Sequence, residues 1–245
     1  MPRLSVNLNK IALLRNSRRT GVPDVLRFVE LARKAGADGI TVHPRPDERH
    51  IRRDDVFALA DLMKPWRPSF ELNLEGYPDE RFLDLCRIVQ PEQCTIVPDL
   101  PTAFTSEEGW RLDDHDRQIV NDAVAALKSM DSRVIVFVNP DAGIVERVPY
   151  TGADGIEIYT GSYAAAARRG SPGDQLRACA SAARAAGRLL VNIGHDLNLE
   201  NIPPLLSAFP SIAEASIGHE LTADALEMGF ERAVGAYKDA LLASA

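Results

Sequence analysis

The chain is organised around residues 36–51, which read Gly36-Ala37-Asp38-Gly39-Ile40-Thr41-Val42-His43-Pro44-Arg45-Pro46-Asp47-Glu48-Arg49-His50-Ile51. The stretch starts as a turn and continues as a short apolar run, Ile40 to Val42, which predicts a buried parallel strand. Charged residues and prolines follow at once, so the side chains of His43, Arg45 and His50 reach one rim of the predicted sheet. A hydrophobic core does not accommodate these three side chains, and we therefore expect chemistry at this rim.

Eight short runs rich in β-branched residues recur along the chain, and each predicts a strand. They are residues 4–8, 40–43, 70–75, 94–98, 134–139, 156–160, 189–195 and 215–219. Segments with helical spacing lie between most of them, and Thr222 is expected to open a last helix that continues to Leu241. Eight strand–helix units in about 250 residues predict an α/β fold, a (β/α)8 TIM barrel with extra helices and a single catalytic domain over residues 1–245. An open doubly wound sheet is the main alternative.

Two segments depart from this alternation. Residues 99–113 are mostly polar and too long for a short connection, which is typical of a lid over a site. Residues 163–170 predict a short extra helix before the main helix at 174–186. Neither segment indicates a boundary between domains.

Composition disfavours several classes of protein. The net charge of −7 and the pI near 5.3 disfavour a sequence-independent grip on nucleic acid, although a local basic pocket for small anions is compatible with them. No apolar run approaches the roughly 20 residues of a membrane-spanning helix, and the first residues lack the apolar middle of a signal peptide. The spacing of Cys86, Cys94 and Cys179 fits neither a disulfide framework nor a zinc ribbon. We therefore expect a cytoplasmic protein without nucleic-acid or membrane partners.

The ends of the predicted strands carry the residues with catalytic chemistry. In a barrel these ends converge on one face, where such enzymes react. That face would gather proton donors and acceptors suited to acid–base catalysis at a carbonyl or imine: His43, Glu75, Glu157, His195 and His219. Further polar residues stand at the same ends: Asn7, Asn9, Asp99, Asn139 and Thr160.

Phosphate binding is a second expectation. Two Gly-His turns, Gly194-His195-Asp196 and Gly218-His219-Glu220, follow the seventh and eighth predicted strands. At these places barrels often bind phosphate with backbone N–H groups and a helix N-terminus. Arginines of the first and second loops would hold a further anionic group: Arg15, Arg18, Arg19 and Arg45. Two phosphates on two substrates, or one bisphosphate, fit this arrangement.

Simpler interpretations of these residues stay open. A single strand-end histidine is as often structural as catalytic, and the arginines of the first loop are equally compatible with a solvated surface. Glu157 would point into the barrel, where an unpaired carboxylate is costly, and this favours a functional role. Zinc at His43, Glu75 and His195 is an alternative. The His-x-His pair typical of metal-hydrolase barrels is absent after the first predicted strand, however, so we expect no metal.

Several stretches of the chain match one known family in the family's order. Besides residues 36–51, they are Val6-Asn7-Leu8-Asn9-Lys10-Ile11-Ala12, Leu14-Arg15-Asn16-Ser17-Arg18, Asn73-Leu74-Glu75, Val97-Pro98, Thr105-Ser106-Glu107, Ile156-Glu157-Ile158-Tyr159-Thr160-Gly161-Ser162-Tyr163-Ala164, Asn192-Ile193-Gly194-His195-Asp196-Leu197 and Ser216-Ile217-Gly218-His219. As a set they resemble the pyridoxine 5′-phosphate synthase family of the deoxyxylulose 5-phosphate-dependent route to vitamin B6.

The resemblance implies a (β/α)8 barrel that condenses 3-amino-2-oxopropyl phosphate with 1-deoxy-D-xylulose 5-phosphate to pyridoxine 5′-phosphate, phosphate and water. By position it makes His43 and Glu75 proton acceptors, His195 a proton donor and Glu157 a stabiliser of the transition state. Two sets of residues would hold the amino-ketone phosphate and the deoxyxylulose phosphate, respectively: Asn7, Arg18, Asp196, Gly218 and His219; and Asn9, Lys10, Arg45, His50 and Thr105. The resemblance further implies no cofactor, small phosphorylated substrates as partners, and a homo-oligomer.

Four places depart from the family pattern. Many members carry Asp-His at Asn9-Lys10, Asp at Asn139, Gly at Asp196 and Gly-Arg at Ala223-Asp224. An acidic Asp224 would oppose a bound phosphate if it pointed at one. Two alternatives therefore stay open, namely a related barrel acting on a different phosphorylated keto-sugar and a non-catalytic sensor of phosphate ligands. A sensor, however, has no need of four proton-transfer groups.

Overall fold

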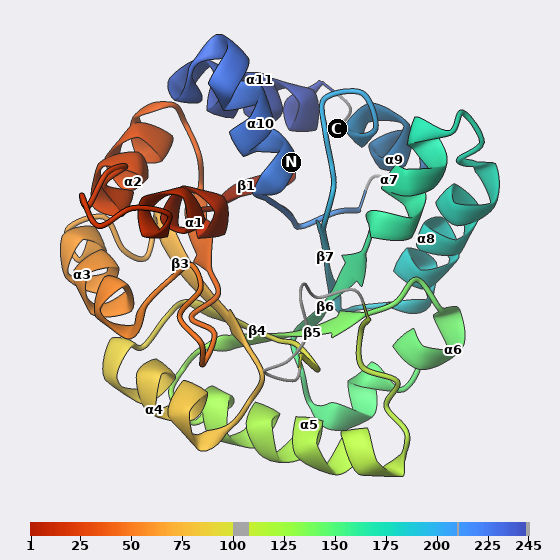
Figure 1. Ribbon diagram of the computed structural model, residues 1–245. Coiled ribbons are helices and arrows are strands. Elements are labelled where there is room, and N and C mark those ends of the chain that lie inside the picture. The colour runs from red at the N-terminus through yellow and green to blue at the C-terminus, as the bar shows by residue number, and fades with distance from the viewer. Residues whose placement is uncertain (100–107, 210, 244–245) are drawn as a thin grey trace.

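Eight parallel strands close into a barrel in the computed structural model, which describes residues 1–99, 108–209 and 211–243 (Figure 1). Each strand pairs with the next one along the chain, and β8 closes the ring against β1, with Ile217 opposite Val6. All eight predicted strands are present, which confirms the (β/α)8 TIM barrel and excludes the open sheet. The strands are β1 (Arg3–Asn7), β2 (Gly39–Val42), β3 (Glu71–Gly76), β4 (Gln93–Ile96), β5 (Arg133–Val138), β6 (Gly155–Tyr159), β7 (Leu190–Gly194) and β8 (Glu214–Ile217).

Helices surround the barrel, as the view of Figure 1 shows. Helix α2 illustrates the cause: the Asp24 side chain caps its start by accepting from the backbone N–H of Leu26, and Val25, Val29 and Ala32 form its buried face. The helices are α1 (Asn9–Asn16), α2 (Val25–Lys34), α3 (Arg53–Met63), α4 (Glu80–Val89), α5 (Asp114–Lys128), α6 (Ala142–Val145), the 3-10 helix η1 (Val148–Thr151), α7 (Gly161–Arg168), α8 (Gly173–Ala185), α9 (Ile202–Ala208), α10 (His219–Met228) and α11 (Phe230–Leu242).

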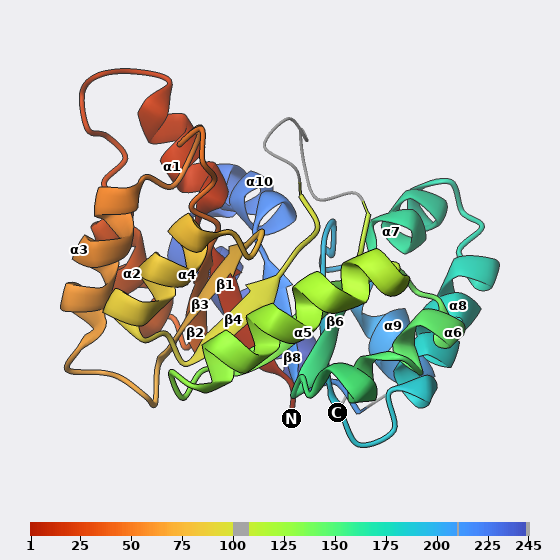
Figure 2. The same cartoon turned by 90° about the horizontal axis from the view of Figure 1, so that it is seen from below.

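The region after β8 differs from the prediction. The sequence predicts one helix from Thr222, but α10 begins at His219, directly after the strand, and α11 follows as a separate helix. Gly229 divides the two with a φ of +89°, a conformation that favours glycine. Helix α1 was also missed, because its sequence lies in what the strand–helix alternation predicts to be a loop. Figure 2 shows α1 and α10 at the same end of the barrel, far from the N-terminus.

Polar side chains occupy much of the barrel interior, where branched apolar side chains are usual. The hydroxyl oxygens of Ser5 and Thr41 lie 2.6 Å apart, and Asn73 donates to the Thr41 hydroxyl at 3.2 Å. Closer to the amino ends of the strands, Gln93 donates to the Glu214 carboxyl at 2.9 Å. At the amino ends themselves, salt bridges join three charged residues: Arg3, Glu71 and Arg133.

The hydrophobic core lies between the strands and the helices. On β1, Leu4 and Val6 are fully buried and alternate with the inward-pointing polar residues, and Ile40 and Val42 do the same on β2. Because this apolar layer is continuous around the barrel, the interior is free to carry chemistry. In the described part of the chain, no helix has the length and apolar character needed to cross a membrane.

Candidate active site

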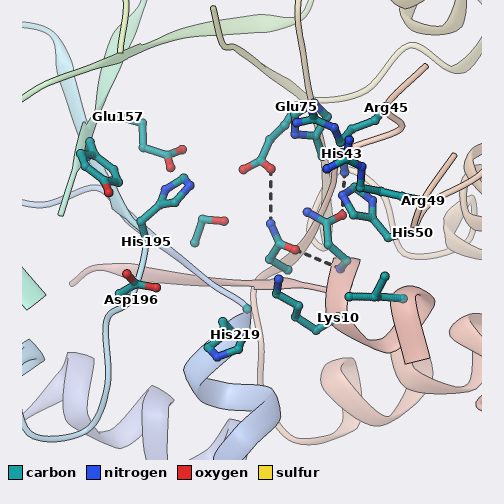
Figure 3. A pocket seen from close by; sticks show the side chains of 16 residues that line it. Lys10, His43, Arg45, Arg49, His50, Glu75, Glu157, His195, Asp196 and His219 are labelled. Atoms are coloured by element: carbon teal, nitrogen blue, oxygen red, sulfur yellow. Dashed lines mark hydrogen bonds between the residues drawn. The ribbon is translucent and has the colours of Figure 1, made fainter. Parts of the chain in front are cut away.

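A cavity of about 460 Å³ opens at the carboxyl ends of the strands and is the candidate active site. Its lining comes from strand ends, from the loop after β2 and from the starts of α1 and α10. Figure 3 draws the sixteen residues that line it: Asn7, Asn9, Lys10, Leu13, His43, Arg45, Arg49, His50, Glu75, Glu157, Tyr159, His195, Asp196, Ser216, Gly218 and His219.

Two asparagines after β1 connect the first three strands at this end. Asn7 donates to Glu75 Oε2 at 3.3 Å and accepts from the backbone N–H of Asn9 at 3.0 Å. Asn9 in turn accepts from the backbone N–H of His43 at 2.9 Å. These hydrogen bonds place His43 and Glu75 on the same side of the cavity, as Figure 3 shows.

Two imidazoles near α1 are kept neutral at pH 7. Burial and then the charges of His50 and Arg45 lower the pKa of His43 well below 6.5. Burial and then Arg45 and Lys10 lower the pKa of His50 to about 4. The two ring centroids lie 6.1 Å apart, so a positive charge on one imidazole disfavours a positive charge on the other. The neutral His43 side chain is therefore available to accept a proton.

Two glutamates face the cavity with carboxyl groups whose pKa values are raised by burial. Burial and then the charge of Asp99 raise the pKa of Glu75 to about 8. Burial and then Glu75 and Glu214 raise the pKa of Glu157 well above 4.5. The Oε2 atom of Glu157 is buried and has no hydrogen-bond partner among the residues that the structure describes. A buried polar atom without a partner destabilises the fold. Such atoms are often found in residues with a functional role.

A glycine beside Glu157 leaves the space that this carboxyl occupies. A Cβ atom at Gly194 would collide with Glu157 Oε1. Gly218, at the end of β8, lies similarly close to the Asn7 side chain, since a Cβ there would approach Asn7 Cβ to 3.0 Å. The glycines of the two Gly-His turns therefore make room for neighbouring side chains, and the phosphate contacts expected of these turns stay a prediction.

The segment after β7 has an unusual backbone. His195 and Asp196 have φ values of +81° and +57°, a region that non-glycine residues rarely adopt. Hydrogen bonds hold it there: the Thr160 hydroxyl lies 2.6 Å from the carbonyl oxygen of His195, and Asn201 donates to the carbonyl oxygen of Asp196 at 3.0 Å. Backbone strain of this kind is common at functional sites.

The guanidinium of Arg45 is balanced by a carboxylate. Arg45 donates to Asp99 at 2.8 Å, and the side chains of both residues are almost fully buried. This pairing lets a buried arginine face the cavity with its charge compensated. Arg45 can therefore contribute directional hydrogen bonds to an anion, and Lys10 adds a second positive charge to the cavity lining.

Of the site residues that the family resemblance implies, the structure brings all into this cavity except Arg18 and Thr105. Arg18 is exposed and does not line the cavity, because the eight-residue helix α1 carries the chain about 12 Å away from the end of β1 before Arg18 is reached. Thr105 lies outside the described residues, as does most of the predicted lid at 99–113. The roles assigned to the other site residues stay predictions.

Arg15 has a structural position instead of the anion-binding one considered from the sequence. It is buried, and its guanidinium donates to Asp55 of α3 at 2.8 Å and to the backbone carbonyl of His50 at 3.1 Å. Asp224 likewise points away from the cavity, because its carboxylate accepts from the Tyr237 hydroxyl at 2.7 Å. Asp224 therefore does not repel a phosphate bound in the cavity, as it would if it pointed at one.

Replacement of Arg15 with alanine is expected to lower the free energy of unfolding by about 3 kcal/mol, because it leaves the Asp55 carboxylate without its partner. Phosphate affinity should change little. Chemical denaturation and calorimetric titration with inorganic phosphate measure the two quantities. Arg19→Ala, at an exposed position nearby, is the control and should alter neither. A stable Arg15→Ala variant with weakened phosphate binding would contradict this assignment.

Four cavity residues were not predicted from the sequence: Leu13, Arg49, Tyr159 and Ser216. Strand alternation contains the signal for two of them, since Tyr159 follows Glu157 by two residues and Ser216 precedes Gly218 by two. Leu13 was missed because helix α1 was missed. No group of three or more His, Cys, Asp or Glu side chains within the described ranges is arranged to hold a metal ion.

Comparison with known proteins identifies the family. The model of the family described as "Pyridoxal phosphate biosynthesis protein PdxJ" matches residues 4–243. A pyridoxine 5′-phosphate synthase of Allorhizobium ampelinum is 48% identical over 247 residues, which cover 97% of each chain. One from Agrobacterium fabrum is 47% identical over 238 residues, covering 95% of this chain and 94% of that one.

Solved structures that resemble the chain support the architecture. A tryptophan synthase structure from M. tuberculosis in its ligand-free form aligns with a TM-score of 0.66 over 98% of this chain and 93% of that one. Its sequence identity of 12% limits the likeness to the fold. The match to the family model and the identity to its relatives extend over almost the whole length, and the chain therefore belongs to the PdxJ family of pyridoxal phosphate biosynthesis proteins.

Proposed function

We propose that this chain is a pyridoxine 5′-phosphate synthase, which condenses 3-amino-2-oxopropyl phosphate with 1-deoxy-D-xylulose 5-phosphate and releases phosphate and water. The observation that carries the proposal is the convergence of two imidazoles and two carboxyl groups of raised pKa on one cavity: His43, His195, Glu75 and Glu157. Amine attack on a ketone, dehydration to an imine, elimination of phosphate and ring closure all require repeated proton transfer. The relatives named above carry the same activity in their names.

His43 and Glu75 are the proposed proton acceptors. The Glu75 carboxylate, with a pKa near 8, is a stronger base than an ordinary glutamate and suits a proton that leaves an ammonium group or a carbon beside a carbonyl. Asn7 binds Glu75 and Asn9 binds the backbone of His43, so both proposed bases face the same part of the cavity. Proximity of this kind removes much of the entropic barrier of the condensation.

His195 and Glu157 act from the opposite side of the cavity. His195 is the proposed proton donor, and burial lowers its pKa, so that its imidazolium form is a stronger acid than free histidine. Glu157 is buried beside it and presents an oxygen that has no protein partner among the described residues. We assign Glu157 the stabilisation of positive charge that develops on the imine nitrogen.

The substrate-binding residues divide between two ends of the cavity. The start of α10 offers backbone N–H groups at Gly218 and His219 for the phosphate of the amino-ketone, together with Asn7. The Asp196 carboxylate suits the ammonium group of the same substrate. The remaining residues would hold the deoxyxylulose phosphate: Asn9, Lys10, Arg45 and His50.

Several broader features of the protein belong to the same proposal. We infer one catalytic domain over residues 1–245, a homo-oligomeric assembly, a cytoplasmic location, and small phosphorylated substrates without nucleic-acid or membrane partners. No cofactor and no metal enter the proposed chemistry, since each step is a proton transfer, an addition or an elimination. These inferences rest on membership of the family and on the cavity.

A condensation assay tests the proposed function. Purified protein is mixed with deoxyxylulose phosphate and freshly generated 3-amino-2-oxopropyl phosphate, and we expect pyridoxine 5′-phosphate to be detected by mass and absorbance. The His43→Asn variant is the control and should form little product. Binding of both substrates without product would refute the proposal and would favour a different phosphorylated ketose.

A further inference from the structure

Two aromatic side chains enclose the imidazole of His195. The ring centroids of Phe137 and His195 lie 5.1 Å apart, and those of Tyr159 and His195 lie 5.2 Å apart with an interplanar angle of 71°. Phe137 and Tyr159 also contact each other edge to face, at 5.9 Å. The three rings therefore form a closed group in which each contacts the other two, which we call the ring cluster.

Hydrogen bonding does not orient this imidazole within the described part of the chain. The backbone around His195 is held by Thr160 and Asn201, but no hydrogen bond or ion pair joins the ring nitrogens of His195 to a described residue. A histidine side chain with two free torsions would otherwise sample several orientations. The contacts within the ring cluster are therefore what limits its orientation.

The barrel holds both aromatic residues firmly. Phe137 points inward from β5 and is fully buried. Tyr159 ends β6, and its position depends on Gly161 at the start of α7, because a Cβ atom there would collide with the Tyr159 hydroxyl. Two neighbouring strands and a glycine thus define where the rings lie. The cluster is a built feature of the cavity, and Tyr159 forms part of the cavity surface.

We propose that Phe137 and Tyr159 are positioning residues for His195, which hold its imidazole so that a ring nitrogen faces the cavity. The proposal rests on the proposed function insofar as His195 is the proton donor. The two rings leave both imidazole nitrogens available to the substrates, whereas a hydrogen-bonded partner would occupy one of them. Aromatic edges and faces thus replace the carboxylate that orients histidine in many other sites.

The ring cluster also sets the electrostatic environment of His195. Apolar faces on two sides disfavour the charged imidazolium, in keeping with the lowered pKa of His195, for which burial is the leading cause. The charged or titratable groups that face it are Asp196 on its own segment, Asp99 after β4, Lys10 on α1, His43 after β2 and Glu157 on β6. The two aspartates raise its pKa and Lys10 lowers it, so loss of a ring should leave the aspartates with the larger effect.

NMR titration of histidine-labelled protein tests this directly, since the chain has only five histidines. The signal of His195 is assigned by its loss in His195→Gln. In Tyr159→Leu and Phe137→Leu we expect the pKa of His195 to rise toward 6.5, kcat to fall at least tenfold and KM to change less than threefold. Tyr159→Phe retains the ring and should keep both the pKa and most of kcat.

The control removes an equivalent aromatic contact elsewhere. Phe28 packs edge to face on Phe230 at 4.7 Å between α2 and α11, and Phe28→Leu should change neither the pKa of His195 nor kcat. In the wild-type protein, nuclear Overhauser contacts between the imidazole of His195 and the rings of Phe137 and Tyr159 test whether the three rings pack together.

The outcomes separate the two proposals. An unchanged pKa of His195 in both leucine variants, or missing Overhauser contacts, would overturn the positioning role whatever the activity. A wild-type protein that forms no pyridoxine 5′-phosphate would overturn the proposed function. The NMR titration would still test whether the ring cluster positions His195. A fall in kcat with no change in the pKa of His195 would indicate general damage and would also count against the role.

Discussion

Replacement of Glu75 with glutamine should lower kcat by about three orders of magnitude and leave substrate binding nearly intact. Glutamine has the size of glutamate and keeps an oxygen that can accept from Asn7, so the framework of hydrogen bonds around the site survives. It cannot accept a proton in the range where the carboxylate does. The loss should therefore appear in kcat, with KM for both substrates changed only severalfold.

Steady-state kinetics and calorimetric titration with each substrate measure these effects. His43→Asn removes the second proposed base and should cause a comparable loss, again with phosphate binding preserved. Glu80→Gln, at an exposed position in the first turn of α4, is the matched control and should retain full activity. Turnover near the wild-type level in either active-site variant would refute the role assigned to that residue.

The barrel was predictable because its signal is repeated. Eight apolar strands with helical segments between them leave few other folds of this length, and each strand lies within a few residues of its predicted position. The errors concern helices that depend on tertiary contacts. Helix α1 follows β1 directly, and no turn residues mark its start in the sequence. Its Arg15 is oriented by Asp55 of α3, which is 40 residues away in sequence. Local patterns contain no information about such a contact.

The site was predictable to the extent that it depends on strand ends. His43, Glu75 and His195 lie at the carboxyl ends of strands, so topology alone brings them together. The direction of each side chain depends on neighbours, and for this reason the sequence did not distinguish Arg45 in the cavity from Arg18 outside it. The place of Tyr159 in the cavity was missed for the same reason, because a tyrosine at a strand end is equally compatible with the core.

The buried carboxyl and imidazole groups should give the stability of the protein two opposite dependences on pH. The pKa of Glu75 rises from 4.5 to about 8 on folding, so with rising pH the unfolded chain releases this proton first, and stability is lost between pH 4.5 and 8. The pKa of His50 falls from 6.5 to about 4, so with falling pH the unfolded chain binds this proton first, and stability is lost between pH 6.5 and 4. At 1.36 kcal/mol per pKa unit the two contributions are about 5 and about 3 kcal/mol.

Substitutions that remove each titration should separate the two contributions. The free energy of unfolding of Glu75→Gln, relative to the wild type, should increase by several kcal/mol between pH 5 and pH 8, because glutamine has no proton to release. The free energy of unfolding of His50→Gln, relative to the wild type, should increase as the pH falls from 7 to 4.5. Urea denaturation of the three proteins across this range measures both differences. If the free energy of unfolding of Glu75→Gln differs from that of the wild type by the same amount at pH 5 and pH 8, Glu75 has an ordinary pKa. That result would also refute its role as a strong base.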